Sequence, residues 1–171
     1  MPDEQGFPAK PGYEHHPMVT VTWFGAKAYC QAYGWRLPTE AEWEKAARGT
    51  DGRPCPWGEE ISPANANFYS SHDPYEASLG KQGDTTPVGF YSGSTYDGFQ
   101  AVDTPSPFGL YDMAGEVWQW TADIHAGVHY CYLRGGSKAN CGVDLRVWVR
   151  NSAGADFHSP NVGFRCARDV K

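Results

Sequence analysis

The 171-residue sequence contains no apolar run near the roughly 18 residues that a membrane-spanning helix needs. It begins with no signal-peptide pattern. Positive charge is also scarce, since 14 Lys and Arg stand against 20 Asp and Glu and the net charge is −6. These absences argue against membrane insertion and against nucleic acid as a partner, and they leave the cellular location unknown.

Cysteine is sparse and lacks any CxxC pair. The five cysteines lie far apart in the chain: Cys30, Cys55, Cys131, Cys141 and Cys166. This spacing argues against a zinc ribbon and against a disulfide-dense scaffold. We expect at most one or two bridges, in an intracellular or compartment-neutral protein.

Aromatic residues, glycine and proline are plentiful. Trp, Tyr and Phe make up 15% of the chain, and 20 Gly with 13 Pro predict many turns and long irregular connections. Length and composition together predict one domain with a sizeable core. We place this domain at residues 16–171, after an extended polar lead-in over residues 1–15.

Two helices are predicted near the N-terminus. Apolar residues recur at steps of three and four over residues 20–34, as on one face of a helix. In residues 36–49, Thr39 followed by Glu42 is a capping-box pattern, and Gly49 is placed to end the helix.

The region from residue 50 to residue 113 shows no sustained helical period and is rich in turn residues. At most one short strand is expected there, at residues 85–91, and aromatic side chains are expected to pack the loops down. Strand-like pieces with alternating or apolar-aromatic patterns follow, at residues 116–123, 129–137, 145–150 and 162–169. Two helices, long loops and a small antiparallel sheet predict an α+β fold.

Seven blocks in sequence order carry a more specific pattern: VTWFGAKAYCQAYGWRLPTEAEWEKAARG, PWGEE, NANF, TTPVGFY, SPFGLYDMAGEVWQW, LRGGS and VGFRCARD. Over about residues 16–169 the chain thereby resembles the formylglycine-generating-enzyme (sulfatase-modifying factor) family. The resemblance implies a C-type-lectin-like fold with little regular structure that commonly carries calcium. Family members usually begin with a further stretch of strands and a helix, so the chain is a shortened member or a piece of a longer protein.

The resemblance also implies a test for catalysis. The family's enzymes oxidise a sulfatase cysteine to formylglycine, with copper held by two cysteines just after Gly-Gly-Ser, and soft thiolates suit copper(I). Here the two positions hold Asn140 and Gly142, with Cys141 alone between them. We therefore predict no copper and no formylglycine generation, and we nominate no catalytic residue. An enzyme or enzyme-accessory member with other chemistry is the alternative.

The resemblance extends to the variable proteins of diversity-generating retroelements. In these proteins Gly-Gly-Ser, Leu-Arg, Arg and Gly-Phe-Arg fix a segment whose intervening side chains vary by adenine randomisation, mostly in AAC codons. Residues 139–144 and 151–161 fall wholly within the set of amino acids that such codons reach, whereas Lys138 and Trp148 do not. A small polar loop in an ordinary family member is the alternative.

A recognition surface over residues 138–161 follows from this interpretation, for a protein or cell-surface ligand of unknown identity. The side chains expected to contact the ligand are Asn140, Val143, Asp144, Trp148, Val149, Ser152, Phe157 and His158. Among them Trp148 and Phe157 are the expected anchors, because exposed aromatic residues dominate binding energy in interfaces.

Two structural calcium sites are implied by the resemblance, since oxygen ligands of this kind suit a hard cation. The first would combine two side chains with two backbone carbonyls: Asp112 and Gln119, with Gly115 and Val117. The second would likewise combine two side chains and two carbonyls: Asn67 and Asp97, with Phe68 and Phe99. The alternative is that both loops are turns stabilised by Asx hydrogen bonds.

The resemblance further implies that Cys30 of the first helix lies beside Cys166. Arginines in or beside strands with aromatic residues are expected to be structural, because one guanidinium can satisfy several loop carbonyls: Arg134, Arg146, Arg150 and Arg165. An anion cradle is the alternative for this set. Phe164 is expected to be scaffold.

Overall fold

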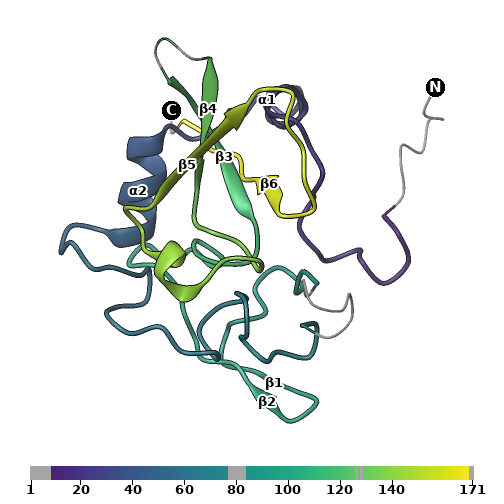
Figure 1. Cartoon of the computed structure of the whole chain (residues 1–171), viewed down its shortest axis with the longest axis vertical. Helices are drawn as coiled ribbons and strands as arrows, with labels where there is room; N and C mark the ends of the chain where they lie inside the picture. The colour runs from purple at the N-terminus through teal and green to yellow at the C-terminus, as the bar shows by residue number, and fades with distance from the viewer. Residues whose placement is uncertain (1–8, 77–83, 126, 128, 170–171) are drawn as a thin grey trace.

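The computed structural model describes residues 9–76, 84–125, 127 and 129–169. Figure 1 shows a sheet with a helix on either side of it, above a region of mostly irregular chain. The elements of the described residues are α1 (Trp23–Ala32), α2 (Glu40–Arg48), β1 (Thr95–Tyr96), β2 (Phe99–Gln100), β3 (Trp118–His125), β4 (Tyr130–Arg134), the 3-10 turn η2 (Gly142–Leu145), β5 (Arg150–Gly154) and β6 (Val162–Phe164). The predicted α+β fold is confirmed.

Both helices form where the sequence predicts them. The Thr22 side chain accepts a hydrogen bond from the Gly25 amide and begins α1. At α2 the capping box is complete, because Thr39 and Glu42 each accept from the other's backbone amide. Local sequence is sufficient to position these helix starts.

The larger sheet has the strand order β5-β4-β3-β6. Antiparallel pairing joins β3 to β4 and β4 to β5, whereas β6 runs parallel to β3, with Trp118 opposite Val162. The prediction of an antiparallel sheet is therefore correct for three of the four strands and wrong for β6.

The strand predicted at residues 145–150 is wrong. Leu145 ends η2, and a turn follows in which the Val149 amide donates to the Arg146 carbonyl. The alternating apolar residues are buried by this turn instead, since Val147 is fully buried and its amide donates to the Pro54 carbonyl. The real strand, β5, starts at Arg150.

The strand predicted at residues 85–91 is also wrong. Gly89 has a positive φ of 77° and the Phe90 amide donates to the Pro87 carbonyl, which makes this segment a turn. The aromatic packing expected for this region is present: Phe90 and Tyr91 are buried, with Tyr75, Tyr96 and Phe99 packed against them.

The largest core cluster lies between α1 and the sheet. It includes Trp23 and Cys30 from α1 and Trp120 from β3. The predicted proximity of Cys30 and Cys166 is confirmed, because the two residues form a disulfide that links positions 136 apart in the sequence.

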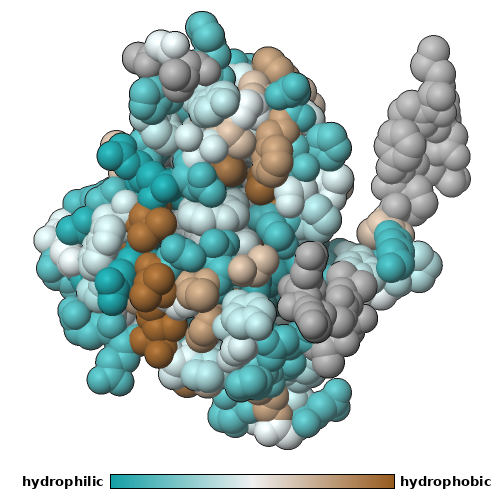
Figure 2. Space-filling model, viewed as in Figure 1, coloured by the Kyte–Doolittle hydropathy of each residue, from teal (hydrophilic) through white to brown (hydrophobic). Residues whose placement is uncertain are grey.

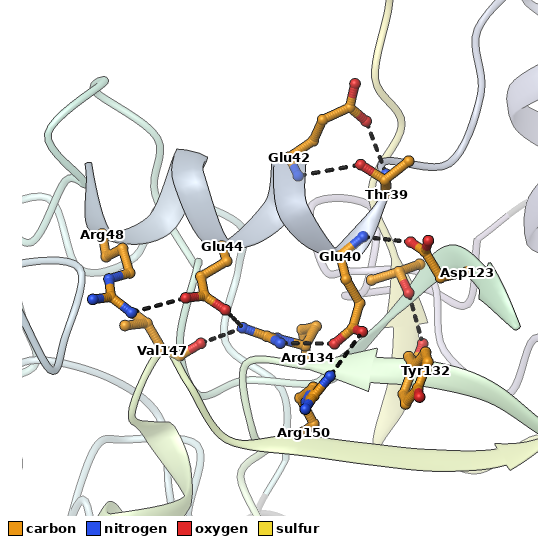
Figure 3. A network of polar contacts seen from close by, with 11 residues as sticks. Thr39, Glu40, Glu42, Glu44, Arg48, Asp123, Tyr132, Arg134, Val147 and Arg150 are labelled. Carbon is orange, nitrogen blue, oxygen red and sulfur yellow. Dashed lines mark hydrogen bonds and ion pairs between the residues drawn. The ribbon is translucent and has the colours of Figure 1, made fainter. Parts of the chain in front are cut away.

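A buried arginine fastens α2 to β4, as Figure 3 shows. The Arg134 side chain is only 2% exposed, and its two terminal nitrogens lie 2.7 Å from carboxylate oxygens of Glu40 and Glu44. It also donates to the Val147 carbonyl and lies over the Trp43 ring, with its Cζ 5.2 Å from the ring centroid. Arg134 is therefore structural, as predicted.

The described end of the polar lead-in, residues 9–15, contacts the loop region. The Val88 amide donates to the His15 carbonyl, and the Tyr13 hydroxyl donates to the Asp84 carboxylate. The domain boundary after residue 15 stays a prediction. Among the described residues, no helix has the length and apolar character to cross a membrane.

Candidate recognition surface

Two glycines fix the start of the recognition segment. Gly135 and Gly136 both have positive φ, and a Cβ on Gly136 would lie 3.0 Å from the Asp144 carbonyl oxygen. A Cβ on Gly135 would lie 3.1 Å from the Met113 carbonyl oxygen. Both glycines adopt a backbone conformation that L residues rarely take, and a Cβ at either position would be unusually close to a carbonyl oxygen, so this anchor behaves as scaffold.

At the far end of the segment, Gly163 is tightly enclosed whereas Phe164 is only half-buried. A Cβ on Gly163 would lie 2.5 Å from the Met18 carbonyl oxygen, so this position requires glycine. Phe164 is half-buried, packed against the main core cluster and 5.4 Å from the Tyr29 ring between centroids. Phe164 is therefore packed as scaffold, as expected, but only partly buried, in a strand at the edge of the sheet.

The positions that hold the family's cysteine pair serve a different purpose here. Asn140 Oδ1 accepts from the Ser137 amide at 3.1 Å and from the Ser137 hydroxyl at 2.6 Å, and its Nδ2 donates to Asp144. Gly142 packs close to Ile61, and Cys141 is an exposed free thiol. Asn140 therefore closes a turn where a metal-binding thiolate would be required.

The predicted ligand-contacting residues divide into two groups of equal size. The exposed ones are Val143 (59%), Trp148 (47%), Phe157 (45%) and His158. The half-buried ones are Asn140, Asp144, Val149 and Ser152. Val149 packs against the main core cluster, which makes it partly scaffold.

Lys138 lies outside the exposed surface. It is 4% exposed, its amide donates to the Glu116 carbonyl, and burial lowers the pKa of its side chain. The exposed part of the segment therefore starts at Ala139 rather than at residue 138.

Two of the four arginines differ from their predicted structural role. Arg146 is exposed, with its Cζ 5.8 Å from the centroid of the Trp148 ring. Arg150 leaves 58% of its side chain exposed and reaches Glu40 at 3.4 Å. Arg165, by contrast, donates to the carbonyls of Tyr111 and Asp112, as a structural arginine does.

The strand of the recognition segment faces the viewer in Figure 1, where β5 is drawn in front of β4 and β3 and the chain between β5 and β6 loops beside the sheet. Figure 2, in the same view, shows apolar surface in narrow patches between hydrophilic residues.

A groove of about 380 Å³ lies between β5, the 155–161 loop and the Ser137–Asn140 turn. Its lining includes three predicted residues, Asn140, Ser152 and Phe157, but also Asn151 and Asn161, which sequence reasoning did not nominate. Both lie in the segment 151–161 that the codon pattern marks, but only the fold brings them together.

The first predicted calcium loop has its side chains committed to other partners. Gln119 Oε1 accepts from Trp43 Nε1 at 2.8 Å and from Arg165 Nε at 2.6 Å, and its Nε2 donates to the Asp112 carbonyl. Asp112 Oδ2 accepts from the Gly89 amide, and burial raises the pKa of this carboxyl. Gln119, which faces a guanidinium, does not fit as a cation ligand in this arrangement.

The other backbone positions of this loop, Gly115 and Val117, are buried, as is Glu116 between them. Glu116 accepts hydrogen bonds from the Thr86 amide and hydroxyl, and burial raises the pKa of its carboxyl well above the usual range. Among the described residues, no three His, Cys, Asp or Glu side chains form a group able to hold a metal ion.

The second predicted calcium site spreads over separate parts of the loop region. Asn67 is buried and donates to the Asp84 carbonyl, whereas Asp97 is exposed in the β1–β2 turn. Phe68 and Phe99 pack against different hydrophobic clusters. Within the part of the chain that the structure describes, no hydrogen bond joins the Asn67 and Asp97 side chains, and the second site stays a prediction.

The sequence as a whole supports the local resemblance. Residues 2–170 match the model of the sulfatase-modifying factor enzyme 1-like domain. The chain belongs to this family.

Several curated relatives are similar to most of this chain. The chain is 39% identical to the serine/threonine-protein kinase Pkn1 of Chlamydia trachomatis, over 95% of this chain and 26% of the kinase. It is 38% identical to the inactive C-alpha-formylglycine-generating enzyme 2 of Mus musculus, over 88% of this chain and 48% of that protein. The formylglycine-generating enzyme of Streptomyces coelicolor is 35% identical, over 93% of this chain and 54% of the enzyme. The chain thus spans between a quarter and about half of these relatives.

Several solved structures have a fold similar to that of this chain. PvdO from Pseudomonas aeruginosa matches with a TM-score of 0.73 and 26% identity, over 91% of this chain and 63% of that structure. Treponema denticola variable protein 1 matches with a TM-score of 0.69 and 22% identity, over 96% of this chain and 76% of that structure. The U1 variant of the Major Tropism Determinant matches with a TM-score of 0.52 and 16% identity, over 85% of this chain and 36% of that structure. The last two likenesses concern the fold alone, and they place this chain among C-type-lectin-like folds.

Proposed function

We propose that this sulfatase-modifying-factor-like domain is a non-catalytic module that binds a protein or cell-surface ligand through residues 139–161. The observation that carries the proposal is the contrast between fixed ends and an exposed middle. Gly135, Gly136 and Gly163 have no room for a side chain, whereas Trp148 and Phe157 are nearly half exposed. Exposed loops on a rigid scaffold tolerate substitution and carry recognition.

The absence of a second thiol beside Cys141 supports the non-catalytic part of the proposal. Asn140 is committed to the Ser137 turn and Gly142 has no side chain, so only one soft ligand is available for copper(I). The names of the relatives do not decide the matter, because they include both an active and an inactive formylglycine-generating enzyme. An enzyme with chemistry other than copper-dependent oxidation is the competing proposal.

A peptide assay distinguishes the two proposals. We expect the purified domain, incubated with copper(I) and a sulfatase-type cysteine peptide, to form no aldehyde detectable by mass spectrometry. We also expect Cys141→Ser to leave copper retention unchanged after desalting. Aldehyde formation above the level of a protein-free control would overturn the non-catalytic proposal.

We further propose that the segment is diversified by a retroelement. The fold shared with Treponema denticola variable protein 1 and with the Major Tropism Determinant supports this origin. So do residues 139–144 and 151–161, whose amino acids can all be encoded by randomised AAC codons. Sequencing the DNA that flanks the gene tests it. A reverse-transcriptase gene beside an adenine-richer near-copy of codons 135–165 is expected, and a locus with neither feature would leave an undiversified binding module.

We retain structural calcium at the Asp112 loop as a proposal, with Asp112 and the Gly115 and Val117 carbonyls as ligands and Gln119 excluded. Because calcium would bind the folded form only, a chelator should lower the melting temperature. Asp112→Ala should melt at the same temperature with and without chelator. Identical melting curves for the wild-type domain in calcium and in chelator would show that the loop is a turn held by protein hydrogen bonds.

A further inference from the structure

The described lining of the groove beside β5 is uncharged. Its polar part consists of three carboxamides and three hydroxyls: Asn140, Asn151 and Asn161, with Ser137, Ser152 and Ser159. Its apolar part consists of Trp118, Leu133, Ala139, Ala153, Phe157 and Val162. Since no Asp, Glu, Lys, Arg or His among the described residues lines the groove, none of them would offset the cost of desolvating an ionic ligand.

Several of these polar groups are left without protein partners. Asn161 Oδ1 is buried and accepts no hydrogen bond from any described residue, and the Asn161 side-chain nitrogen donates none to them either. The Asn151 carboxamide accepts from the Ser152 amide through Oδ1, which leaves its two N–H donors unused within the described chain. Asn151 is exposed, whereas Asn161 Oδ1 is a buried polar atom without a partner, which is rare in folded proteins and calls for an explanation.

The rim of the groove adds an apolar surface. Phe157 is 45% exposed although its own amide is fixed by a hydrogen bond to the Gly154 carbonyl. An exposed aromatic ring held on a fixed backbone is suited to packing against the apolar face of a ligand. The groove therefore combines unpaired amide donors and acceptors with one flat apolar wall.

We propose that this groove binds the end of a neutral saccharide, which makes the ligand of the recognition surface a glycan. The inference rests on the proposed function, since it names the ligand class of the same surface. Adjacent sugar hydroxyls both donate and accept, which matches the Asn161 carboxamide and the unused Asn151 N–H donors. The C–H face of a sugar ring is apolar and matches Phe157.

The size of the groove favours this occupant over a polypeptide. A volume of about 380 Å³ lies at the small end of the range for small-molecule sites. A protein partner needs roughly 800 Å² of contact on each side, which would extend far beyond this groove onto Val143 and Trp148. The two occupants therefore depend on different residues.

The test uses methyl glycosides of glucose, galactose, mannose and N-acetylglucosamine as probes, with nitrogen-15 NMR of the purified domain. At least one is expected to bind with a roughly millimolar Kd, as befits a ligand of about a dozen non-hydrogen atoms. The shifted amides should lie at Asn151, Ser152, Phe157 and Asn161. Excess chelator should leave the affinity unchanged, because no metal ion takes part.

Matched variants separate the groove from its surroundings. Asn161→Ala and Phe157→Ala should each weaken glycoside binding by roughly tenfold. Asn161 uses its backbone, not its side chain, to hold Trp118 and Ser159, so the alanine variant should fold. Phe108→Ala, at an exposed aromatic residue outside the groove lining and outside residues 139–161, should leave glycoside binding unchanged.

Failure to bind any of these glycosides, or binding that ignores Asn161→Ala and Phe157→Ala, would overturn the saccharide proposal. Binding that is lost with chelator at a temperature where the domain remains folded would also overturn it. A protein ligand whose binding is abolished by Trp148→Ala but not displaced by glycosides would refute the saccharide while supporting the recognition surface. Aldehyde formation in the peptide assay, by contrast, would refute the proposed function itself.

Discussion

Replacing Arg134 with methionine is expected to lower the free energy of unfolding by about 3–5 kcal/mol, as measured by urea denaturation. The guanidinium lies 2.7 Å from both Glu40 and Glu44, and its side chain is 2% exposed. The substitution removes the buried cation between two partly buried carboxylates, which keep only Arg150 at 3.4 Å from Glu40 and Arg48 at 2.8 Å from Glu44. It also removes the Arg134 donor from the Val147 carbonyl. Since α2 meets β4 through these contacts, the loss should appear as cooperative destabilisation of the whole domain.

Arg150→Met is the matched control for this prediction. Arg150 contacts the same Glu40 carboxylate, but at 3.4 Å and with 58% of its side chain exposed. Exposed ion pairs of this kind contribute about 0–1 kcal/mol. Equal destabilisation by the two variants would mean that burial of Arg134 does not determine its contribution.

Removal of the Cys30–Cys166 disulfide is expected to cost roughly 4–5 kcal/mol in the chain-entropy model. The bond links residues 136 positions apart and thereby restricts most of the unfolded chain. Cys166→Ser is the preferred variant because Cys166 is half-buried, whereas a substitution at the fully buried Cys30 would also disturb the core. Thermal and urea denaturation under non-reducing conditions provide the measurement.

The control for the disulfide is Cys141→Ser, since Cys141 is exposed and free. It should leave the free energy of unfolding within about 0.5 kcal/mol of wild type. A wild-type domain whose stability is unaffected by reductant would contradict the assigned contribution of the disulfide.

Local sequence was sufficient for the elements whose determinants are local. The capping box of Thr39 and Glu42 defines the start of α2 without help from the rest of the chain. The pairing of Cys30 with Cys166 could be anticipated only through the family resemblance, because nothing in the spacing of the five cysteines selects that pair.

Strand assignment failed where burial and pairing are determined by distant residues. Residues 145–150 alternate as a strand does, yet Val147 is buried in a turn. There its amide donates a hydrogen bond to the Pro54 carbonyl. Arg150–Gly154 carries no apolar alternation and still forms β5, because β4 supplies the hydrogen bonds. Tertiary context overrides β-propensity in both segments.

The sequence predicted the segment that carries the recognition surface, but only half of the side chains nominated in it are exposed. The set of amino acids that randomised AAC codons encode indicates positions that can vary. It does not show that Val149 packs on the core or that Asn140 closes a turn. The free carboxamide of Asn161 could not be found from sequence at all, because its lack of a partner depends on residues from several elements.

The central claim is that an exposed recognition surface lies between fixed glycine anchors. A display library with every single substitution at eight positions, scored for resistance to protease, tests it most directly. The exposed set is Val143, Trp148, Phe157 and His158, and the scaffold set is Gly135, Gly136, Leu145 and Gly163.

Substitutions in the exposed set are expected to change the free energy of unfolding by no more than about 0.5 kcal/mol. Leu145→Ala should cost about 2–5 kcal/mol, and side chains at the three glycines should be at least as disruptive. Destabilisation of the same size in both sets would contradict the account, because the segment would then be core with no surface left to bind a ligand.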